Sequence, residues 1–252
     1  MTETRDMMGG LAKGLAVIES FSADRPRQSI AQVAAATGLD RATARRCLLT
    51  LAQGGYAEYD GKFFTLAPRI LRLGTACLAT MPLPRVVQPM LDDLSDRIGQ
   101  STSVSVLDGD EIVYVARAAQ LRVMSISLMP GSRLPAYCTS MGRVLLAGLP
   151  EAEARAILGP GPLPARSPRT LTDPEAVMAT LARVRADGHA LIDQEVELGL
   201  RSMAVPLFNA RGALVAALNV GLAAGSEPMA ELAARFGPPL RATQADLRAL
   251  LS

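Results

Sequence analysis

The sequence predicts a mixed α/β fold in two parts, a small helix-rich N-terminal part and a larger part in which strands and helices alternate. Two observations lead to this prediction. Up to about residue 80, apolar residues recur at helical spacing around a single short hairpin signal, whereas runs of alternating apolar and polar residues appear after residue 100. We expect a first domain at 8–68, a linker helix at 69–82 and a second domain at 83–252.

The composition indicates a globular protein. Apolar residues make up 49 % and charged residues 20 % of the 252 residues, which argues against disorder. The longest apolar stretch, 212–225, is shorter than the roughly 18 residues of a membrane span, and the polar N-terminus does not resemble a signal peptide. The three cysteines form no C-x-x-C pair, so we expect reduced thiols, a cytoplasmic location and no membrane partner.

Consecutive helix signals begin the chain. Leu11, Leu15 and Ile18 mark a helix over 10–22. Ser29 and the Gln three residues later form a capping box, which predicts a helix from residue 30 to near Gly38. Asp40 then caps a helix at 41–53. Because Gly tolerates a left-handed turn, the pair 30–38 and 41–53 has the pattern of a helix-turn-helix.

A hairpin follows these helices. The Asp60-Gly61 pair lies between two β-prone runs, 56–59 and 62–66, and such a pair is the strongest short hairpin signal. Helix-turn-helix and hairpin together predict a winged helix-turn-helix that binds double-stranded DNA.

Basic and polar side chains of this part are the expected DNA contacts. At the start of the helix at 41–53 they are expected on the solvent-facing side, where Arg can pair with guanine. The alternative is an arginine-rich, solvated helix, because the chain has only 26 basic against 24 acidic residues. The expected DNA-contacting residues are Lys13, Ser29, Arg41, Thr43, Arg45, Arg46 and Lys62.

The larger part is predicted from shorter signals. Strands are expected at 102–107, 111–116, 121–128, 190–193, 202–208 and 213–220. Helices are expected at 86–98, 139–148, 151–158, 174–186 and 228–250, the last interrupted by the Gly-Pro-Pro at 237–239.

The whole chain resembles the IclR family of bacterial transcription regulators. The resemblance is carried by GLAKGLAVI at 10–18, PGSRLPAYCTSMGR at 130–143 and DQEVELGLRSMAVP at 193–206. Tyr137 and Arg143 replace the His and Lys of many members, which is similar to the branch that controls protocatechuate and 4-hydroxybenzoate catabolism through the β-ketoadipate route.

The resemblance implies a GAF-like effector domain with a mainly antiparallel sheet. It implies homodimers, often paired into tetramers as dimers of dimers, on palindromic operators. It also implies an effector pocket near Ser140, Met141, Asp193, Ser202 and Asn219. The effector expected from this branch is a small carboxylic acid.

Three more residues are candidates for the effector pocket. Arg133 and Arg201 can each hold a carboxylate through two hydrogen bonds, or can be structural ion-pair arginines. Tyr137 can stack on an aromatic ring or bond a phenol, or can be a core tyrosine.

An enzyme is the less favoured interpretation. The single histidine, His189, excludes a two-histidine metal site, and the chain has neither a phosphate-binding loop nor a nucleophile elbow. We therefore expect no catalytic residues, no metal and no cofactor. An enzyme with an appended DNA-binding module and a DNA-binding protein without an effector remain the alternatives.

Overall fold

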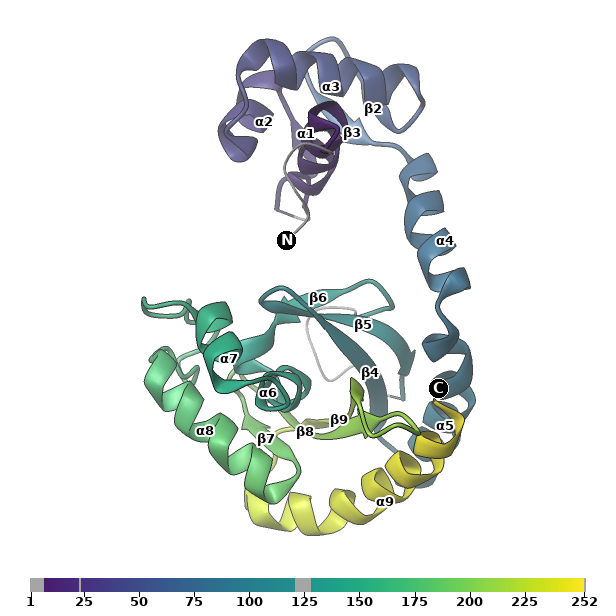
Figure 1. Ribbon diagram of the computed structural model, residues 1–252, viewed down its shortest axis with the longest axis vertical. Coiled ribbons are helices and arrows are strands. Elements are labelled where there is room, and N and C mark those ends of the chain that lie inside the picture. The colour runs from purple at the N-terminus through teal and green to yellow at the C-terminus, as the bar shows by residue number, and fades with distance from the viewer. Residues whose placement is uncertain (1–6, 23, 121–127, 252) are drawn as a thin grey trace. The chain divides into compact units, whose positions relative to one another are not determined.

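The computed structural model of the chain describes residues 7–22, 24–120 and 128–251. The described residues form two compact units, one that ends at Ala79 and one that begins at Thr80. Figure 1 shows the ribbon of both, and each unit is described by itself below.

The N-terminal unit is a helix-turn-helix with a small sheet. Its elements are α1 (Gly9–Glu19), β1 (Arg27–Gln28), α2 (Ile30–Thr37), α3 (Arg41–Gln53), β2 (Ala57–Tyr59), β3 (Phe64–Leu66), the 3-10 turn η2 (Pro68–Ile70) and α4 (Leu71–Thr80).

Local capping fixes the turn between α2 and α3, and it confirms the predicted start and end signals. The Ser29 hydroxyl accepts from the Gln32 N–H, and the Gln32 side chain accepts from the Ser29 N–H. Gly38 has a left-handed φ of 69°, and the Asp40 carboxylate accepts from the Thr43 N–H at 2.8 Å. The helices then pack on a core of Val17, Val33, Ala34, Ala44, Leu48 and Phe64.

The predicted hairpin is confirmed, and a third strand joins it. The strand order is β1-β3-β2, with all pairs antiparallel. The Asp60 carboxylate closes the tip by accepting from the N–H groups of Lys62 and Phe63 at 2.9 and 2.8 Å, and it pairs with Arg27 of β1. These bonds hold the pKa of Asp60 well below its usual range, with the Phe63 N–H as the largest cause.

The second unit is a six-stranded antiparallel sheet between helices. Its order is β6-β5-β4-β9-β8-β7. The elements are α5 (Pro82–Ile98), β4 (Ser101–Asp108), β5 (Glu111–Ala118), β6 (Arg133–Pro135), the 3-10 turn η3 (Ala136–Cys138), α6 (Ser140–Ala147), α7 (Glu151–Leu158), α8 (Pro174–Asp187), β7 (Ala190–Asp193), β8 (Leu200–Phe208), β9 (Leu214–Ala223) and α9 (Met229–Leu250).

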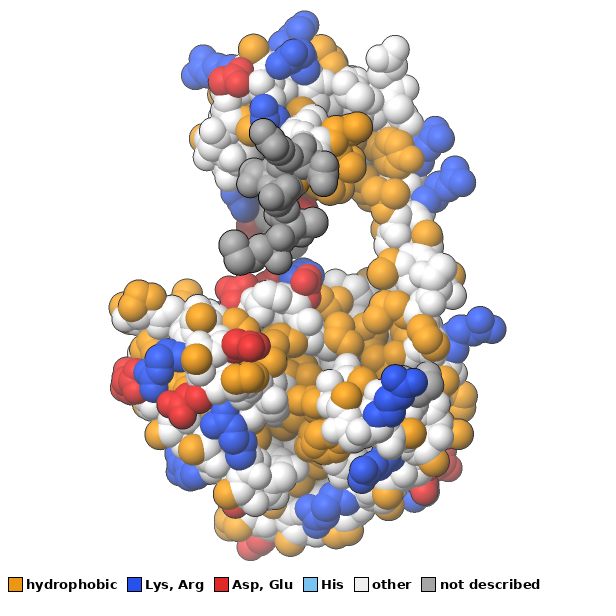
Figure 2. Space-filling view, viewed as in Figure 1, with side chains coloured by type: hydrophobic (Ala, Val, Ile, Leu, Met, Phe, Trp, Pro, Cys, Tyr) orange, Lys and Arg blue, Asp and Glu red, His pale blue; other side chains and the backbone are white. Residues whose placement is uncertain are grey.

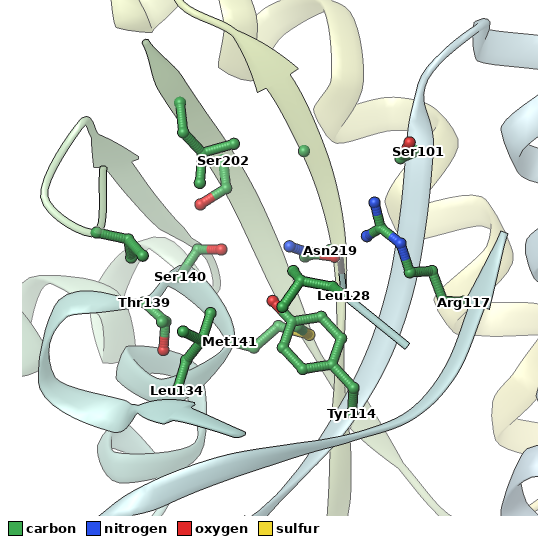
Figure 3. A pocket seen from close by; sticks show the side chains of 13 residues that line it. Ser101, Tyr114, Arg117, Leu128, Leu134, Thr139, Ser140, Met141, Ser202 and Asn219 are labelled. Carbon is green, nitrogen blue, oxygen red and sulfur yellow. The ribbon is translucent and has the colours of Figure 1, made fainter. Parts of the chain in front are cut away.

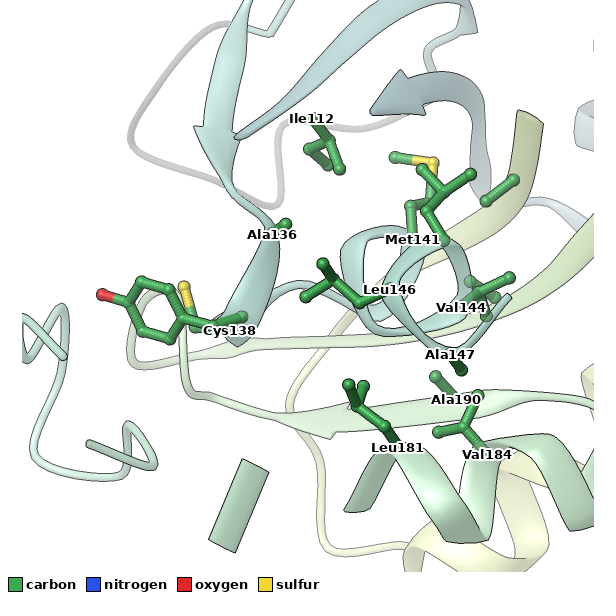
Figure 4. Packing of buried hydrophobic residues seen from close by; sticks show 14 of the residues in the cluster. Ile112, Ala136, Cys138, Met141, Val144, Leu146, Ala147, Leu181, Val184 and Ala190 are labelled. Atoms are coloured by element: carbon green, nitrogen blue, oxygen red, sulfur yellow. The ribbon is translucent and has the colours of Figure 1, made fainter. Parts of the chain in front are cut away.

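Each face of this sheet has its own core. On one face, α6 and α8 pack Met141, Leu146 and Leu181 against the strands, as Figure 4 shows. On the other face, α5 and α9 bury Leu91, Leu94, Phe236, Leu240 and Leu247 against apolar residues of β4, β8 and β9. The expected α/β fold with a mainly antiparallel sheet is confirmed.

Two predictions about elements need correction or fall outside the described residues. The strand expected at 121–128 lies outside the described residues except for Leu128, and the strand that pairs with β5 at one edge of the described sheet is β6, which was not expected. The interruption expected at 237–239 is wrong, because α9 runs through Pro238 and Pro239. Both halves of α9 bury apolar side chains, Leu232 and Phe236 before the prolines and Leu240 and Leu247 after them. Packing therefore outweighs the two missing N–H donors.

Among the described residues, no single helix has the length and apolar content of a membrane span. One sharply bent pair of helical segments, 68–77 and 82–98, meets those criteria only when the two are taken together.

Candidate functional sites

A row of serines lines one face of β4. Ser101, Ser103 and Ser105 alternate with Thr102 and Val104, so the three hydroxyls share the sheet face on which α6 packs. On β9, Asn219 pairs with Ser103, and on β8, Ser202 pairs with Gly221 of β9. Small polar groups therefore lie on a face where a sheet that packs on a helix normally buries larger apolar side chains.

A β-bulge adds two further side chains to this face. Ser105 pairs with Tyr114 and Val104 with Ala116, which leaves Val115 unpaired. Because of this extra residue, Tyr114 and Arg117 both lie opposite serines of one face, at Ser105 and Ser103. Without the bulge, positions three apart on β5 would face opposite sides of the sheet.

The N-terminus of α6 lies opposite the polar face of the sheet and borders the same cavity. The Thr139 hydroxyl caps α6 by accepting from the Gly142 N–H at 3.1 Å. A Cβ atom at Gly142 would lie 2.1 Å from the carbonyl oxygen of Ala136, so only glycine allows η3 and α6 to pack this closely. Ser140 and Met141, in the first turn, are both buried.

These elements enclose a cavity of about 30 Å³. Figure 3 shows Arg117 and Ser140 on opposite sides of it, with Asn219 between them. About 10–15 Å³ suffices for one water molecule, so an aromatic or aliphatic acid can enter only if lining side chains move. The lining residues are Ser101, Tyr114, Arg117, Leu128, Leu134, Thr139, Ser140, Met141, Val196, Leu200, Ser202, Asn219 and Gly221.

Arg117 is the half-buried cation of this cavity. Its guanidinium donates to the Ser103 hydroxyl at 2.9 Å, and none of the ion pairs formed by the described residues includes it. Burial lowers the pKa of Arg117 from its ordinary value, although a guanidinium stays charged in proteins. A positive charge that is partly removed from water and has no carboxylate partner is favourably placed to bind an anion.

Two buried polar atoms of the cavity lack a hydrogen-bond partner among the described residues. They are the Ser140 hydroxyl oxygen and the Asn219 side-chain carbonyl oxygen. Leaving a buried polar group unbonded typically costs about 1–3 kcal/mol. The cavity therefore offers one cation and two unsatisfied polar atoms, which is the pattern of a site for a small polar acid.

Four of the residues expected in the effector pocket do line this cavity, namely Ser140, Met141, Ser202 and Asn219. The other four do not line it. Arg133 is exposed on β6, and its guanidinium pairs with Asp108 at 2.8 Å and Glu111 at 2.6 Å. Tyr137 is buried, but its hydroxyl donates to the Pro164 carbonyl outside the cavity.

The remaining two residues pair with each other. Arg201 binds Asp193 at 2.6 Å and the Glu227 carbonyl at 2.7 Å. Asp193 also binds Arg169 at 2.7 Å. Desolvation raises the pKa of Asp193, but the bonds from Arg201 and Gln194 outweigh it, so the pKa is lowered. Asp193 is thus a structural carboxylate whose charge Arg201 already neutralises.

The candidate nucleic-acid interface lies on α3 and the wing. Arg41, Ala42 and Arg45 are exposed on one face of α3. Thr43 was expected on the same face, which is wrong, because only 7 % of its surface is exposed. Arg46 is exposed but lies beside Thr43, whose hydroxyl accepts from its guanidinium at 3.4 Å.

The other three expected DNA contacts are spread over the unit. Lys62 is exposed at the wing tip, with its ammonium 5.2 Å from the centre of the Phe63 ring. The side chain of Ser29 is engaged in the capping box of α2. Lys13 is exposed on α1, on a hollow shared with Arg46.

That hollow is a large apolar groove within the N-terminal unit, with a volume of about 720 Å³. Its walls include Leu11, Leu15 and Leu73, which are 61 %, 45 % and 51 % exposed. Figure 2 shows hydrophobic side chains reaching the surface in this unit. Exposed leucines gathered on one surface are typical of a protein contact.

Within the described parts of the chain, no group of three or more His, Cys, Asp or Glu side chains could hold a metal ion. Cys138 is buried, and burial raises the pKa of its thiol to about 11, so it is a poor nucleophile at neutral pH.

Comparison with known proteins gives matches over both units. The family described as "Bacterial transcriptional regulator IclR C-terminal" matches residues 75–248, and the one described as "IclR helix-turn-helix domain" matches residues 10–61.

Three similar proteins are informative. The Pca regulon regulatory protein of Pseudomonas putida is 46 % identical over 96 % of this chain and 84 % of its own length. The p-hydroxybenzoate hydroxylase transcriptional activator of Acinetobacter baylyi is 39 % identical over 98 % of this chain and 93 % of its own. A crystal structure of a double mutant of the PobR inducer-binding domain from Acinetobacter with 3-hydroxybenzoic acid has a TM-score of 0.63 and 35 % identity, and covers 68 % of this chain and all of that domain.

Proposed function

The chain belongs to the IclR family of bacterial transcriptional regulators, and from this premise we propose that a small carboxylic acid controls how its helix-turn-helix binds operator DNA. The acid binds in the cavity that is lined by Arg117, Ser140 and Asn219. Relatives named for the Pca regulon and for p-hydroxybenzoate hydroxylase support a role in the catabolism of aromatic compounds. A regulator of this kind acts in the cytoplasm, where it meets the chromosome.

The observation that carries the proposal is Arg117. It is the charged residue among those that line the cavity, and it has no carboxylate partner among the described residues. Arg133 and Arg201, by contrast, are each neutralised by carboxylates of the protein. We infer that Arg117 binds the effector's carboxylate, because guanidinium and carboxylate form two parallel hydrogen bonds.

Two further polar atoms of the cavity support a more specific class of acid. Ser140 and Asn219 present oxygen atoms without partners, and an amide oxygen accepts but cannot donate. A phenolic hydroxyl can donate to the Asn219 oxygen, whereas this oxygen would repel a second carboxylate. We infer that the effector is a hydroxylated aromatic acid, such as 4-hydroxybenzoate or protocatechuate, in preference to β-ketoadipate. The ring of Tyr114 and the apolar side chains of Leu134 and Met141 can enclose the aromatic ring.

A ligand panel tests this function. Binding of a ligand to the folded state alone raises the melting temperature. We expect 4-hydroxybenzoate or protocatechuate to raise it and to change operator affinity, and benzoate and β-ketoadipate to do so more weakly. In Arg117→Met, both responses should disappear while operator binding without effector persists. Arg133→Met is the matched control and should respond as the wild type does. A full response in Arg117→Met would exclude Arg117 as the partner of the carboxylate.

We also infer the assembly on DNA. The apolar groove between α1 and α3 supports a homodimer, because a second copy can bury the exposed leucines that surround it. A twofold dimer presents two recognition helices, which matches a palindromic operator. Two such dimers can form a tetramer. In this arrangement, residues 69–82 link a DNA-binding domain at 8–68 to an effector domain at 83–252.

We infer that the chain binds its acid without converting it. Arg117 is the ionisable group of the cavity besides the Tyr114 phenol, whose pKa burial raises to about 12, so neither serves as a general base at neutral pH. Recovery of the acid unchanged after incubation with the protein is the expected result, and turnover would favour an enzyme with an appended DNA-binding module.

A further inference from the structure

One side chain connects α5 to the effector cavity by two hydrogen bonds. The Gln88 amide on α5 donates from Nε2 to the Arg117 carbonyl oxygen at 3.1 Å, and its Oε1 accepts from the Arg117 N–H at 3.3 Å. The Gln88 amide thus pairs with Arg117 as the backbone of a neighbouring strand would. The same Nε2 also donates to Asp92, one turn further along α5, at 2.9 Å.

The position on β5 explains why a side chain takes this role. Among the described strands, β6 pairs with β5 only at residues 111–113. At Arg117, β5 pairs with Ser103 of β4 on one side, and the backbone groups of Arg117 bond to Gln88 instead of a described strand on the other. The side chain of Arg117 meanwhile points toward the cavity, as Figure 3 shows. Arg117 therefore contacts the cavity with its guanidinium and α5 with its backbone.

Gln88 lies in the part of α5 nearest to α4 along the chain. Helix α4 ends at Thr80 and α5 begins at Pro82, so Gln88 follows the junction by fewer than two turns. The next residue, Pro89, has no N–H and cannot bond to the Arg85 carbonyl within the helix. The first turns of α5 are thus held less firmly by the helix itself and depend more on outside contacts such as the bonds from Gln88.

Effector entry must alter the surroundings of Arg117. The cavity of about 30 Å³ is too small for an aromatic acid unless lining side chains move, and the guanidinium that would bind the carboxylate is itself one of these side chains, held at Nη1 by its bond to the Ser103 hydroxyl. A ligand changes a distant affinity only through an element whose position differs between two states. A shift of Arg117 reaches α5 directly through the paired bonds to Gln88.

We propose that Gln88 couples effector binding to DNA binding, by transmitting the displacement of Arg117 to the start of α5 and so to the linker at 69–82. The proposal rests on the proposed function, because it requires that an acid binds beside Arg117. Gln88 is a positioning residue that touches neither effector nor DNA. Coupling free energies correspond typically to affinity changes of about 5–150-fold, so the loss of one coupling contact is measurable.

The test compares Gln88→Leu with a matched control in the full-length protein. Gln120→Leu removes another amide that bonds to α5, since Gln120 Nε2 donates to Asp96 at 2.6 Å, but this bond ends on a carboxylate and not on Arg117. For each protein, operator affinity is titrated with and without saturating 4-hydroxybenzoate or protocatechuate, and effector affinity is measured by calorimetry.

We expect a specific loss in Gln88→Leu. The ratio of operator affinities with and without effector should fall by about fivefold or more toward one, whereas operator affinity without effector stays at the wild-type value. Effector affinity should change only by the coupling that is lost, since linkage is reciprocal. Gln120→Leu should keep the wild-type ratio.

Three results overturn the proposal. If Gln88→Leu keeps the full ratio, the coupling takes another route. If it loses effector binding altogether, as Arg117→Met is expected to do, Gln88 maintains the cavity and does not transmit its occupancy. If the wild-type protein itself shows no response to any acid of the panel, the proposed function fails and the coupling fails with it. Only this third result is measured on the wild-type protein, so failure of the proposed function is distinguishable from failure of the coupling through Gln88.

Discussion

Three arginines of the second unit show how the surroundings of a residue decide what it does. Arg133 and Arg201 are bound by carboxylates of the protein at 2.6 Å, so their charges are already neutralised. Arg117 has the same side chain but shares its space with a serine hydroxyl and a cavity. Residue type alone does not distinguish the three arginines as binders of an acid. The groups that surround each guanidinium do.

The arginines of α3 differ in a similar way, which gives a prediction for DNA binding. Arg45→Ala should weaken operator binding by about 1–3 kcal/mol if its guanidinium contacts a base. Arg46→Ala should weaken it less, because Arg46 bonds to Thr43 beside the apolar groove. Fluorescence anisotropy with an operator duplex at fixed salt measures both. Equal losses would mean that Arg46 also reaches the DNA.

At the scale of elements, a buried ion pair joins α6 to the connection between β7 and β8. Arg143 is 2 % exposed, and its Nη2 lies 2.7 Å from the Glu195 carboxylate, while its Nε donates to the Tyr137 carbonyl at 2.9 Å. Glu195 also accepts from the Leu171 N–H at 3.1 Å. Both joined elements contribute to the cavity, with Met141 from α6 and Val196 from the connection. The pair therefore fixes the distance between two walls of the cavity.

Breaking this pair should destabilise the second unit. Glu195→Leu leaves a buried guanidinium without its carboxylate, and removing one partner of a buried pair typically costs about 3–5 kcal/mol. The double variant Arg143→Met with Glu195→Leu removes both charges and should be more stable than Glu195→Leu alone. Urea unfolding followed by circular dichroism gives the free energies of unfolding. A double variant less stable than the single one would show that attraction within the ion pair, and not the cost of an unpaired buried charge, dominates the free energy of unfolding.

At the scale of the whole molecule, the N-terminal unit has more apolar surface than a DNA-binding domain needs for folding. Its own core is complete, with Val17, Leu48 and Phe64 fully buried. The leucines along the groove nevertheless face outward. In the proposed homodimer, association of two copies would remove this surface from water, with a gain of roughly 25 cal/mol for each Å² of apolar area buried.

A charge in the groove should therefore disrupt assembly. Leu15→Arg places a guanidinium on this apolar surface, so we expect a smaller mass by light scattering and weaker binding to a two-half-site operator. Leu250→Arg is a suitable control, because Leu250 is 57 % exposed at the end of α9 and is not among the residues that line the groove. Unchanged mass and operator affinity in Leu15→Arg would place the dimer contact elsewhere.

Local signals predicted the N-terminal unit well. The capping box at Ser29, the left-handed Gly38 and the Asp60-Gly61 hairpin each involve residues a few positions apart, so the sequence specifies them directly. The sequence did not predict the burial of Thr43, because which side of α3 is covered depends on how α1 packs against it. The serines at 101, 103 and 105 were a usable signal for a polar cavity wall, since they alternate along a strand.

The residues in their order along the chain were enough to predict the family, the mixed α/β fold, the helix-turn-helix with its wing, and four residues of the cavity. Which arginine is left without a carboxylate partner depended on the three-dimensional packing. The β-bulge at Val115 brings Arg117 onto the cavity face, and carboxylates from Asp108, Glu111 and Asp193 neutralise the two other candidates. The physical reason is that charge pairing acts through space, between residues whose proximity is set by strand register and not by their order along the chain.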